Sequence, residues 1–396
     1  MRILWYSNSP DIPTGYGVQT AQVAGRMAKD GHEVHVHGNF GHRAGFRQVD
    51  GMTVWPEGID RYSLDVASEF ARMVEPDVVF TLYDVWVMKP ETDWVGRNVL
   101  SWTPVDHYPA PPDVLKWARG HRTIAMSEYG AEQFRSAGIE PVATIPHGIE
   151  DVYRPTPSGM RATQGIPDDA FVVMVNAANI GTTPPRKAWS ENIQALAAFI
   201  ARHDDAYVYL HTDLARPSGV PLPVLIEALG IPRGRIKVAP PFLYRAGMLD
   251  DAYMAAVYSM SDVLLAASKG EGFGVPVIEA MGCGVPAIVS DFSAQPELVG
   301  DTGWKVSVQL DWDWNQGAFF ATPIIASIFA ALEDAYRQRG TRQQACVERA
   351  ERFRAQTLYD QHWRPLLASL AEPEAPRVKR PGNTNAAKRR NRKAAA

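Results

Sequence analysis

Cysteines and long apolar segments are both scarce in this sequence. Of its 396 residues only Cys283 and Cys346 are cysteines, so a disulfide framework is not the basis of the fold. No apolar run approaches the ~20 residues that a membrane-spanning helix needs. The first residues, Met1 to Ser7, are typical of a strand and lack the regions of a signal peptide. We therefore expect a cytoplasmic protein with no transmembrane segment.

Signatures of a redox cofactor and of a metal site are incomplete as well. Gly15-Tyr16-Gly17 follows the first predicted strand, but the third glycine of a dinucleotide fingerprint is missing. These glycines form either a plain tight turn or a loop that approaches phosphates. Of the histidines at positions 32, 35 and 37, only two would share a strand face, and a zinc site needs more ligands. We predict no cofactor and no metal.

Length and periodicity favour two domains. The chain is long for one domain, and its 46% hydrophobic and 21% charged residues are ordinary for a globular enzyme. Strand-like and helix-like segments alternate over residues 1–155 and again over 168–355, and a segment rich in proline, glycine and serine separates them. This alternation predicts an α/β fold with two Rossmann-like, doubly wound parallel sheets. We expect strands at residues 2–7, 33–37, 77–82, 98–103, 123–126, 142–146, 170–176, 207–211, 236–239, 262–267 and 286–290. We expect helices at residues 18–29, 128–136, 189–201, 224–229, 250–260, 276–282, 324–338, 342–354 and 358–370.

The composition changes abruptly at residue 372. Prolines and asparagines become frequent, and residues 377–396 contain basic side chains but no acidic ones. We predict a disordered basic tail over 372–396, which either contacts a polyanion such as nucleic acid or only keeps the chain soluble. The net charge is −4, and subtracting the eight Lys and Arg of residues 377–396 leaves −12 on residues 1–376. The oligomeric state stays open.

The segment that follows the predicted strand at 262–267 has the features of a ligand site. Gly272 and Gly274 let a backbone approach a ligand closely. A helix is predicted to start at Pro276, and its free N–H groups favour an anion. Glu271 lies on the loop, and Glu279 lies about one turn into the helix. The segment therefore predicts a phosphate at the helix start with sugars on either side.

Glu271 and Glu279 are separated by seven residues and are flanked by Gly-Phe-Gly and by Glu-Ala-Met-Gly-Cys-Gly-Val-Pro. This pattern resembles the Glu-x7-Glu signature of family 4 of the retaining, GT-B-fold glycosyltransferases. The resemblance extends over about residues 1–370 and is strongest from 98 to 297. It implies two Rossmann-like domains that face a cleft, with a last helix at 356–371 crossing back to the first domain. It also implies metal-independent transfer of a sugar from a nucleotide-sugar donor to an acceptor hydroxyl, with retention of configuration.

The resemblance assigns roles to side chains at the ends of the predicted strands. The catalytic groups would be His107, Lys187 and Glu271, with His107 beside the donor sugar or else only a packing or capping residue. Tyr16, Asp84 and Asp106 would lie on the acceptor side. The donor would be bound by Gly15, Gly17, Asn179, Arg186, Lys187, Glu271, Gly272, Phe273, Gly274, Val275 and Glu279.

The basic pair departs from the pattern of the resembled family. Arg186 and Lys187 lie in a proline-rich loop where two cations can neutralise a diphosphate. Lys187 fits the family lysine, but Asn179 occupies the position of the family arginine. Whether Arg186 replaces that arginine stays open, and a solvated basic turn is the alternative.

Asp311-Trp-Asp313 is similar to the metal-binding Asp-x-Asp of glycosyltransferases with a different fold. We interpret it here as part of a tryptophan-rich loop that is structural or faces the acceptor.

Several functions fit the sequence, and the main hypothesis is a retaining glycosyltransferase whose acceptor is a glycan, lipid or protein. The alternatives are a glycosyltransferase that acts on hydroxylated bases in DNA, a nucleotide-sugar epimerase, and an inactive GT-B binding protein that works through its basic tail. Intact Glu271, Glu279 and Lys187 argue against the inactive protein, whereas the missing arginine argues for it.

Overall fold

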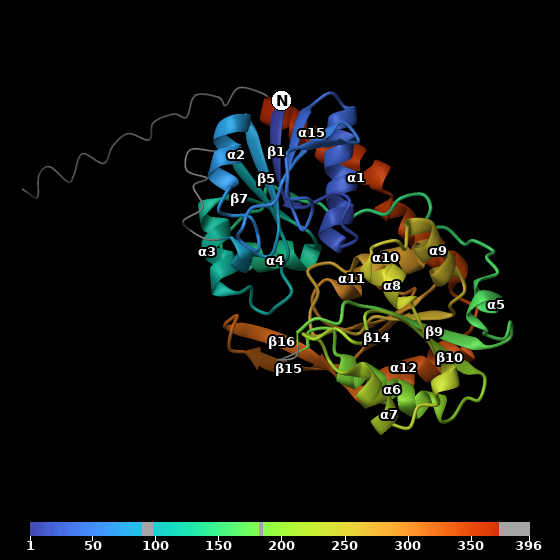
Figure 1. Cartoon of the computed structure of the whole chain (residues 1–396). Coiled ribbons are helices and arrows are strands. Elements are labelled where there is room, and N and C mark those ends of the chain that lie inside the picture. The colour runs from blue at the N-terminus through green and yellow to red at the C-terminus, as the bar shows by residue number, and fades with distance from the viewer. Residues whose placement is uncertain (89–97, 182–184, 372–396) are drawn as a thin grey trace, which may run out of the picture.

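Two β-sheets, one in each half of the chain, form the frame of the protein (Figure 1). The computed structural model describes residues 1–88, 98–181 and 185–371. Helices cover both sheets, so each half is a Rossmann-like unit, as the alternation of segments predicted. Segments that follow strands of the first sheet contact segments that follow strands of the second. The carboxyl ends of the two sheets therefore face each other, which is where ligands bind in open α/β folds.

Within the described residues, the first sheet has eight strands in the order β3-β4-β2-β1-β5-β6-β7-β8, and only the β3–β4 pair is antiparallel. The central strands are buried on both faces, which explains why their sequences are continuous apolar runs. The strands are β1 (Arg2–Asn8), β2 (Glu33–Asn39), β3 (Arg47–Val49), β4 (Met52–Trp55), β5 (Val78–Leu82), β6 (Val99–Thr103), β7 (Arg122–Ala125) and β8 (Ala143–Thr144). The helices are α1 (Gly15–Lys29), α2 (Ala67–Val74), η1 (Val85–Val87), α3 (Pro112–Gly120) and α4 (Glu128–Ser136).

The second sheet, as far as the chain is described, has six parallel strands in the order β11-β10-β9-β12-β13-β14. Its strands are β9 (Phe171–Asn176), β10 (Ala206–His211), β11 (Ile236–Val238), β12 (Val263–Leu265), β13 (Ala287–Ser290) and β14 (Trp304–Val306). Its helices are α5 (Met160–Gln164), α6 (Trp189–Ile200), α7 (Leu222–Ala228), η2 (Arg233–Arg235), α8 (Pro241–Arg245), α9 (Asp251–Ser259), α10 (Val275–Gly282), α11 (Gln295–Val299), α12 (Ile325–Arg337), α13 (Gln343–Ala350) and η3 (Glu351–Phe353).

Helix starts follow the capping residues in the sequence. Ser127 was predicted to cap the helix at 128–136, and its side chain accepts a hydrogen bond from Gly130 N at 3.0 Å. Helix α1 begins three residues earlier than predicted, because Thr14 caps it by accepting from Gly17 N at 3.1 Å. Gly15 and Gly17 therefore belong to the first turn of a helix.

The tryptophan-rich segment is an antiparallel hairpin, so the prediction of a loop there was wrong. Its strands are β15 (Val308–Asp313) and β16 (Ala318–Pro323), and the hairpin extends beyond the second sheet toward the first unit (Figure 1). Most of β15 is exposed, so it carries polar side chains that hide the strand signal of its valine, leucine and tryptophan. Strands β3, β4 and β14 and helices α2, α3, α5, α8 and α11 were also missed, and all are short.

The last helices return to the first unit, as predicted from the resemblance. They are α14 (Ala355–Leu358), the π-helical turn η4 (Tyr359–Trp363) and α15 (Arg364–Ala371), which lies beside the first sheet in Figure 1. The Trp363 ring packs against Trp5, Phe80 and Trp102 at centroid distances of 5.9, 5.7 and 4.9 Å. The segment predicted as a basic tail, 372–396, lies outside the described residues.

The two cysteines and the lack of long apolar segments have counterparts in the structure. Cys283 and Cys346 are buried, and both thiols are free in the described part of the chain. Among the described helices, none is long and apolar enough to cross a bilayer.

Replacing Trp363 with alanine should lower the free energy of unfolding by ~3–5 kcal/mol, because the ring is almost fully buried among three aromatic rings. Urea unfolding followed by far-ultraviolet circular dichroism measures the change without relying on tryptophan emission. The matched control is Trp314→Ala, whose side chain is 87% exposed and should change stability by less than ~0.5 kcal/mol. Equal losses in the two variants would contradict the packing of the last helices on the first sheet.

Candidate active site

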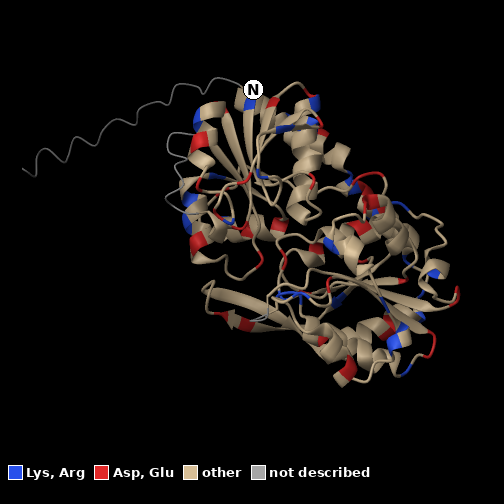
Figure 2. Cartoon of the chain, viewed as in Figure 1, with Lys and Arg blue, Asp and Glu red and all other residues tan. Residues whose placement is uncertain are grey.

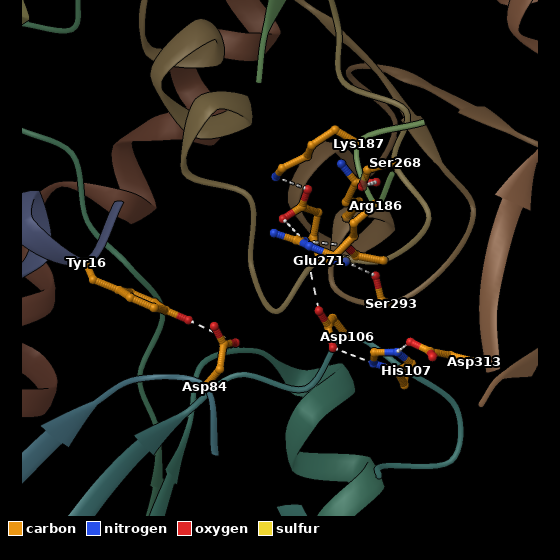
Figure 3. Close-up of polar contacts among 12 residues, drawn as sticks. Tyr16, Asp84, Asp106, His107, Arg186, Lys187, Ser268, Glu271, Ser293 and Asp313 are labelled. Atoms are coloured by element: carbon orange, nitrogen blue, oxygen red, sulfur yellow. Dashed lines mark hydrogen bonds and ion pairs between the residues drawn. The ribbon is translucent and has the colours of Figure 1, made fainter. Parts of the chain in front are cut away.

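Five ionisable side chains and a histidine meet where the two sheets face each other (Figure 3). Arg186 and Lys187 come from the loop between β9 and α6, and Glu271 from the loop between β12 and α10. The first unit contributes Asp84 after β5, and Asp106 with His107 after β6. Each group thus follows a strand, which is why segments far apart in the sequence come together here.

Glu271 is clamped between two cations. Arg186 Nη1 lies 2.9 Å from Glu271 Oε2, and Lys187 Nζ lies 2.5 Å from Glu271 Oε1. Burial alone would raise the pKa of Glu271, but the charges of Arg186 and Lys187 overcome it and lower the pKa to about 2. Glu271 is therefore ionised at neutral pH, whereas burial, and after it the charge of Arg186, lowers the pKa of Lys187.

Neighbouring backbone holds this cluster in place. Arg186 Nη1 also donates to the carbonyl of Gly270 at 2.7 Å, and the N–H of Glu271 donates to Ser293 Oγ at 2.9 Å. The N–H of Lys269 donates to the carbonyl of Arg186 at 2.8 Å, so the two loops are joined directly. Hydrogen bonds thus join the loop of the two cations to the loop of the carboxylate.

The glycines of the Glu271 loop serve contact between the two units. A Cβ at Gly270 would overlap the carbonyl oxygen of Asp106, and a Cβ at Gly272 would overlap Cβ of Pro104. We expected Gly272 to let a backbone approach a ligand closely, and the structure places Pro104 of the first unit beside it. Gly274 has φ +119°, a conformation that L side chains rarely adopt, and it directly precedes α10.

The side of the site that the first unit forms is acidic. Tyr16 Oη lies 3.3 Å from Asp84 Oδ1, and Asp106 Oδ2 lies 3.9 Å from Arg186 Nη1. Burial, and after it the charge of Asp106, raises the pKa of Asp84 to about 6. Burial also raises the pKa of the Tyr16 hydroxyl, so Tyr16 is a neutral donor to Asp84. The structure brings these three predicted acceptor-side residues to the same place.

His107 is buried and bonded to carboxylates on both sides. Its Nδ1 lies 2.6 Å from Asp106 Oδ1, and its Nε2 lies 3.4 Å from Asp313 Oδ2 on the hairpin. The ring stacks on Phe320 with centroids 3.7 Å apart. Asp313 was not among the predicted site residues, although the Asp-x-Asp pattern had drawn attention to it.

Glu279, on α10, is the end of a buried chain of hydrogen bonds that also includes residues of α9 and β9. Tyr258 Oη donates to Glu279 Oε2 at 2.8 Å, and Asn176 Nδ2 donates to Tyr258 Oη at 2.7 Å. Burial raises the pKa of Glu279 to about 7. Tyr258, on α9, gave no signal in the sequence, because its spacing is that of any core-facing helix residue.

The other predicted donor residues lie in several parts of the two units. The side chain of Asn179 bonds to the backbone of Asp213 and Val220, which secures a loop of the second unit. Phe273 is buried in the core, where it meets the ring of His147 edge-on. Val275 begins α10. At Gly17 an added Cβ would overlap the carbonyl oxygen of Ile12, as in a tight turn, whereas at Gly15 it would meet no described heavy atom within 4 Å.

Comparison with known proteins agrees with this architecture. Residues 222–314 match the family model "Glycosyl transferases group 1". Sucrose-phosphate synthase from Thermosynechococcus elongatus superposes with a TM-score of 0.70, at 17% identity, over 93% of this chain and 99% of that one. Anabaena HepE in complex with UDP-glucose superposes with a TM-score of 0.65, at 18% identity, over 92% of this chain and 99% of that one.

The chain is also similar in sequence to curated glycosyltransferases. A D-inositol 3-phosphate glycosyltransferase from Actinosynnema mirum is 28% identical over 50% of this chain and 48% of its own length. The serotype-specific mannosyltransferase WbdA of Escherichia coli is 29% identical over 61% of this chain and 32% of its own length. The chain thus spans less than half the length of these two curated relatives. The described residues form both Rossmann-like units of a GT-B fold, in agreement with the predicted fold class.

The raised pKa of Glu279 makes a testable contribution to stability. Between the ordinary value of 4.5 and about 7, the folded chain holds a proton that the unfolded chain has lost, so this contribution falls as pH rises through that window. Glu279→Gln removes the titration and keeps an acceptor for Tyr258. Relative to wild type, the variant should therefore gain ~2–3 kcal/mol in free energy of unfolding between pH 5 and pH 8. Denaturant titrations at the two pH values measure this gain. Glu348→Gln, exposed on α13, is the control, and the same gain there would contradict the assignment.

Proposed function

We propose that this protein transfers a sugar from a nucleotide-sugar donor to an acceptor hydroxyl, with retention of anomeric configuration. The observation that carries the proposal is the pair of cations, Arg186 and Lys187, held on either side of Glu271 beside the start of α10. Two cations held close together suit a diphosphate. The homologues named above, which include a complex with UDP-glucose, support a nucleotide-sugar donor.

When the donor binds, the ion pairs between the two cations and Glu271 would be replaced by ion pairs between the cations and the diphosphate. A bound diphosphate would take the cations that now neutralise Glu271, and the carboxylate would then accept hydrogen bonds from hydroxyls of the donor sugar. Arg186 would replace the family arginine, because Asn179 is committed to the backbone of its own unit. Glu279, further inside α10, would accept from the ribose hydroxyls.

The transfer would take place on one face of the sugar. The bond between the anomeric carbon and the diphosphate oxygen breaks, and its electron pair leaves with the diphosphate. The acceptor oxygen bonds to that carbon from the same face, and its proton passes to the leaving phosphate oxygen. Positive charge on the sugar is stabilised by nearby carboxylates, and negative charge on the diphosphate by Arg186 and Lys187. His107 would contact the donor sugar from the opposite unit.

The acceptor would enter beside Tyr16, Asp84 and Asp106. A glycan, lipid or protein hydroxyl fits this side better than DNA, because Lys and Arg are interspersed with Asp and Glu over both units in Figure 2. A nucleotide-sugar epimerase would convert the donor into its epimer with no acceptor and no net release of nucleoside diphosphate, whereas the proposed transferase releases nucleoside diphosphate only when an acceptor is added. An inactive binding protein would not turn over donor at all.

We further propose that the protein works in the cytoplasm.

Substituting either cation should slow transfer. Lys187→Ala should lower kcat/KM roughly 30- to 1,000-fold, because negative charge grows on the leaving diphosphate. This corresponds to a loss of ~2–4 kcal/mol of transition-state stabilisation. Arg186→Ala should cost as much if it replaces the family arginine. Release of nucleoside diphosphate from UDP-, GDP- and ADP-sugars in the presence of candidate acceptors measures the effect.

The control for this series is Lys305→Ala, an exposed lysine on β14 of the same unit, which should leave turnover unchanged. If neither Arg186→Ala nor Lys187→Ala alters turnover in folded protein, the basic turn has only a structural role.

Turnover should also survive an excess of EDTA, because two protein cations already face the diphosphate position. Complete loss of activity, restored by added manganese or magnesium, would contradict metal-independent transfer.

A further inference from the structure

The β15–β16 hairpin belongs to the second unit but holds a loop of the first. The N–H of Tyr108 donates to the carbonyl of Phe319 at 3.0 Å, and the N–H of Phe319 donates back to the carbonyl of Tyr108 at 2.8 Å. This reciprocal pair is an antiparallel bridge between the two units. The loop that carries His107 is therefore joined to the hairpin through its backbone.

The same hairpin strand is also joined to the loop that carries Glu271. The N–H of Ala321 donates to the carbonyl of Lys269 at 2.9 Å, two residues before Glu271. Between these two attachments, the Phe320 ring stacks on the His107 ring. One short strand thus sets the position of His107 relative to Glu271.

Asp313 completes the contact with a side chain. Its carboxylate is 7% exposed and lies 3.4 Å from His107 Nε2, while Asp106 Oδ1 faces Nδ1 on the other side of the ring (Figure 3). Because a carboxylate faces each ring nitrogen of His107, turning the imidazole over would place carbon atoms against both carboxylates. The two contacts therefore favour one orientation of the ring. Asp311 lies two residues earlier on the same strand and is exposed, so the two acids of the Asp-x-Asp pattern differ in environment.

We propose that Asp313 is a positioning residue that fixes the imidazole of His107 in the assembled active site, and that the β15–β16 hairpin holds the two units together for this purpose. The proposal rests on the proposed function, because His107 is taken to contact the donor sugar. It gives the Asp-x-Asp pattern a role in orienting a side chain rather than in binding metal.

The kinetic test compares Asp313→Ala with Asp311→Ala. Loss of the acceptor at Nε2 should lower kcat about 10- to 100-fold with little change in the KM of the donor, because a misplacement of about 1 Å costs that much in an oriented site. Asp311→Ala should behave as wild type. Asp313→Asn, which keeps an oxygen that accepts a hydrogen bond, should restore part of the rate.

A double-mutant cycle separates positioning from a general structural role. If Asp313 acts through His107, adding Asp313→Ala to His107→Ala should lower kcat no further. If the two losses multiply, Asp313 does not act through His107, and the proposal is overturned.

The closing experiment does not depend on turnover. Nitrogen-15 spectra of the imidazole groups in the full-length protein report the His107 ring, whose signals are assigned by their absence in His107→Ala. Asp313→Ala should shift the Nε2 signal of His107, and Asp311→Ala should leave it in place. An unchanged His107 signal in folded Asp313→Ala would overturn the proposal. If wild type transfers no sugar but the His107 signal shifts as expected, the proposed function fails while the contact between Asp313 and His107 stands.

Discussion

A buried carboxylate is stable in its charged form only while its counter-charges stay within bonding distance, and Glu271 is held in this way by Arg186 and Lys187. Removing either cation leaves Glu271 with one counter-charge in place of two. The loops that carry these side chains are also bonded to each other. A ligand that binds here has to offer at least as much negative charge as Glu271 does, and the diphosphate of a nucleotide-sugar meets that requirement.

The two units are assembled around this cluster by contacts of several kinds. Gly270 and Gly272 allow backbone to meet backbone between the units. The hairpin clasps the loop of His107, and Trp363 anchors the end of the chain on the first sheet. Each contact joins a segment of one unit to a strand end or core of the other. The positions of the acidic first unit and the basic loop of the second are thus coupled, although no strand pairs one large sheet with the other among the described residues.

Sequence reasoning predicted the fold class and the loop around Glu271 because apolar strands, capping residues and the glycines before the helix are local signals. It could not predict partners across the two units. Gly272 lies against Pro104 of the first unit, and a glycine required by such contact has the same signature in the sequence as one that approaches a ligand. Asn179 bonds within its own unit, and only the fold reveals that. Asp313 belongs to a hairpin whose exposed strand has weak periodicity. The only signal at Asp313 was the Asp-x-Asp pattern, which suggests metal binding and does not indicate the contact with His107.

The central claim is that Arg186 and Lys187 form a diphosphate site, and thermal unfolding in the presence of nucleotides tests it most directly. UDP, GDP and ADP are compared with the corresponding nucleosides, each at the same concentration. At least one diphosphate should raise the unfolding midpoint of wild type, since a ligand at 100 times its Kd adds ~2.7 kcal/mol, and its nucleoside should raise the midpoint far less. The diphosphate effect should be lost in Lys187→Ala. If no diphosphate raises the midpoint, or if a nucleoside raises it as much as its diphosphate does, the two cations are not a diphosphate site and the account is wrong.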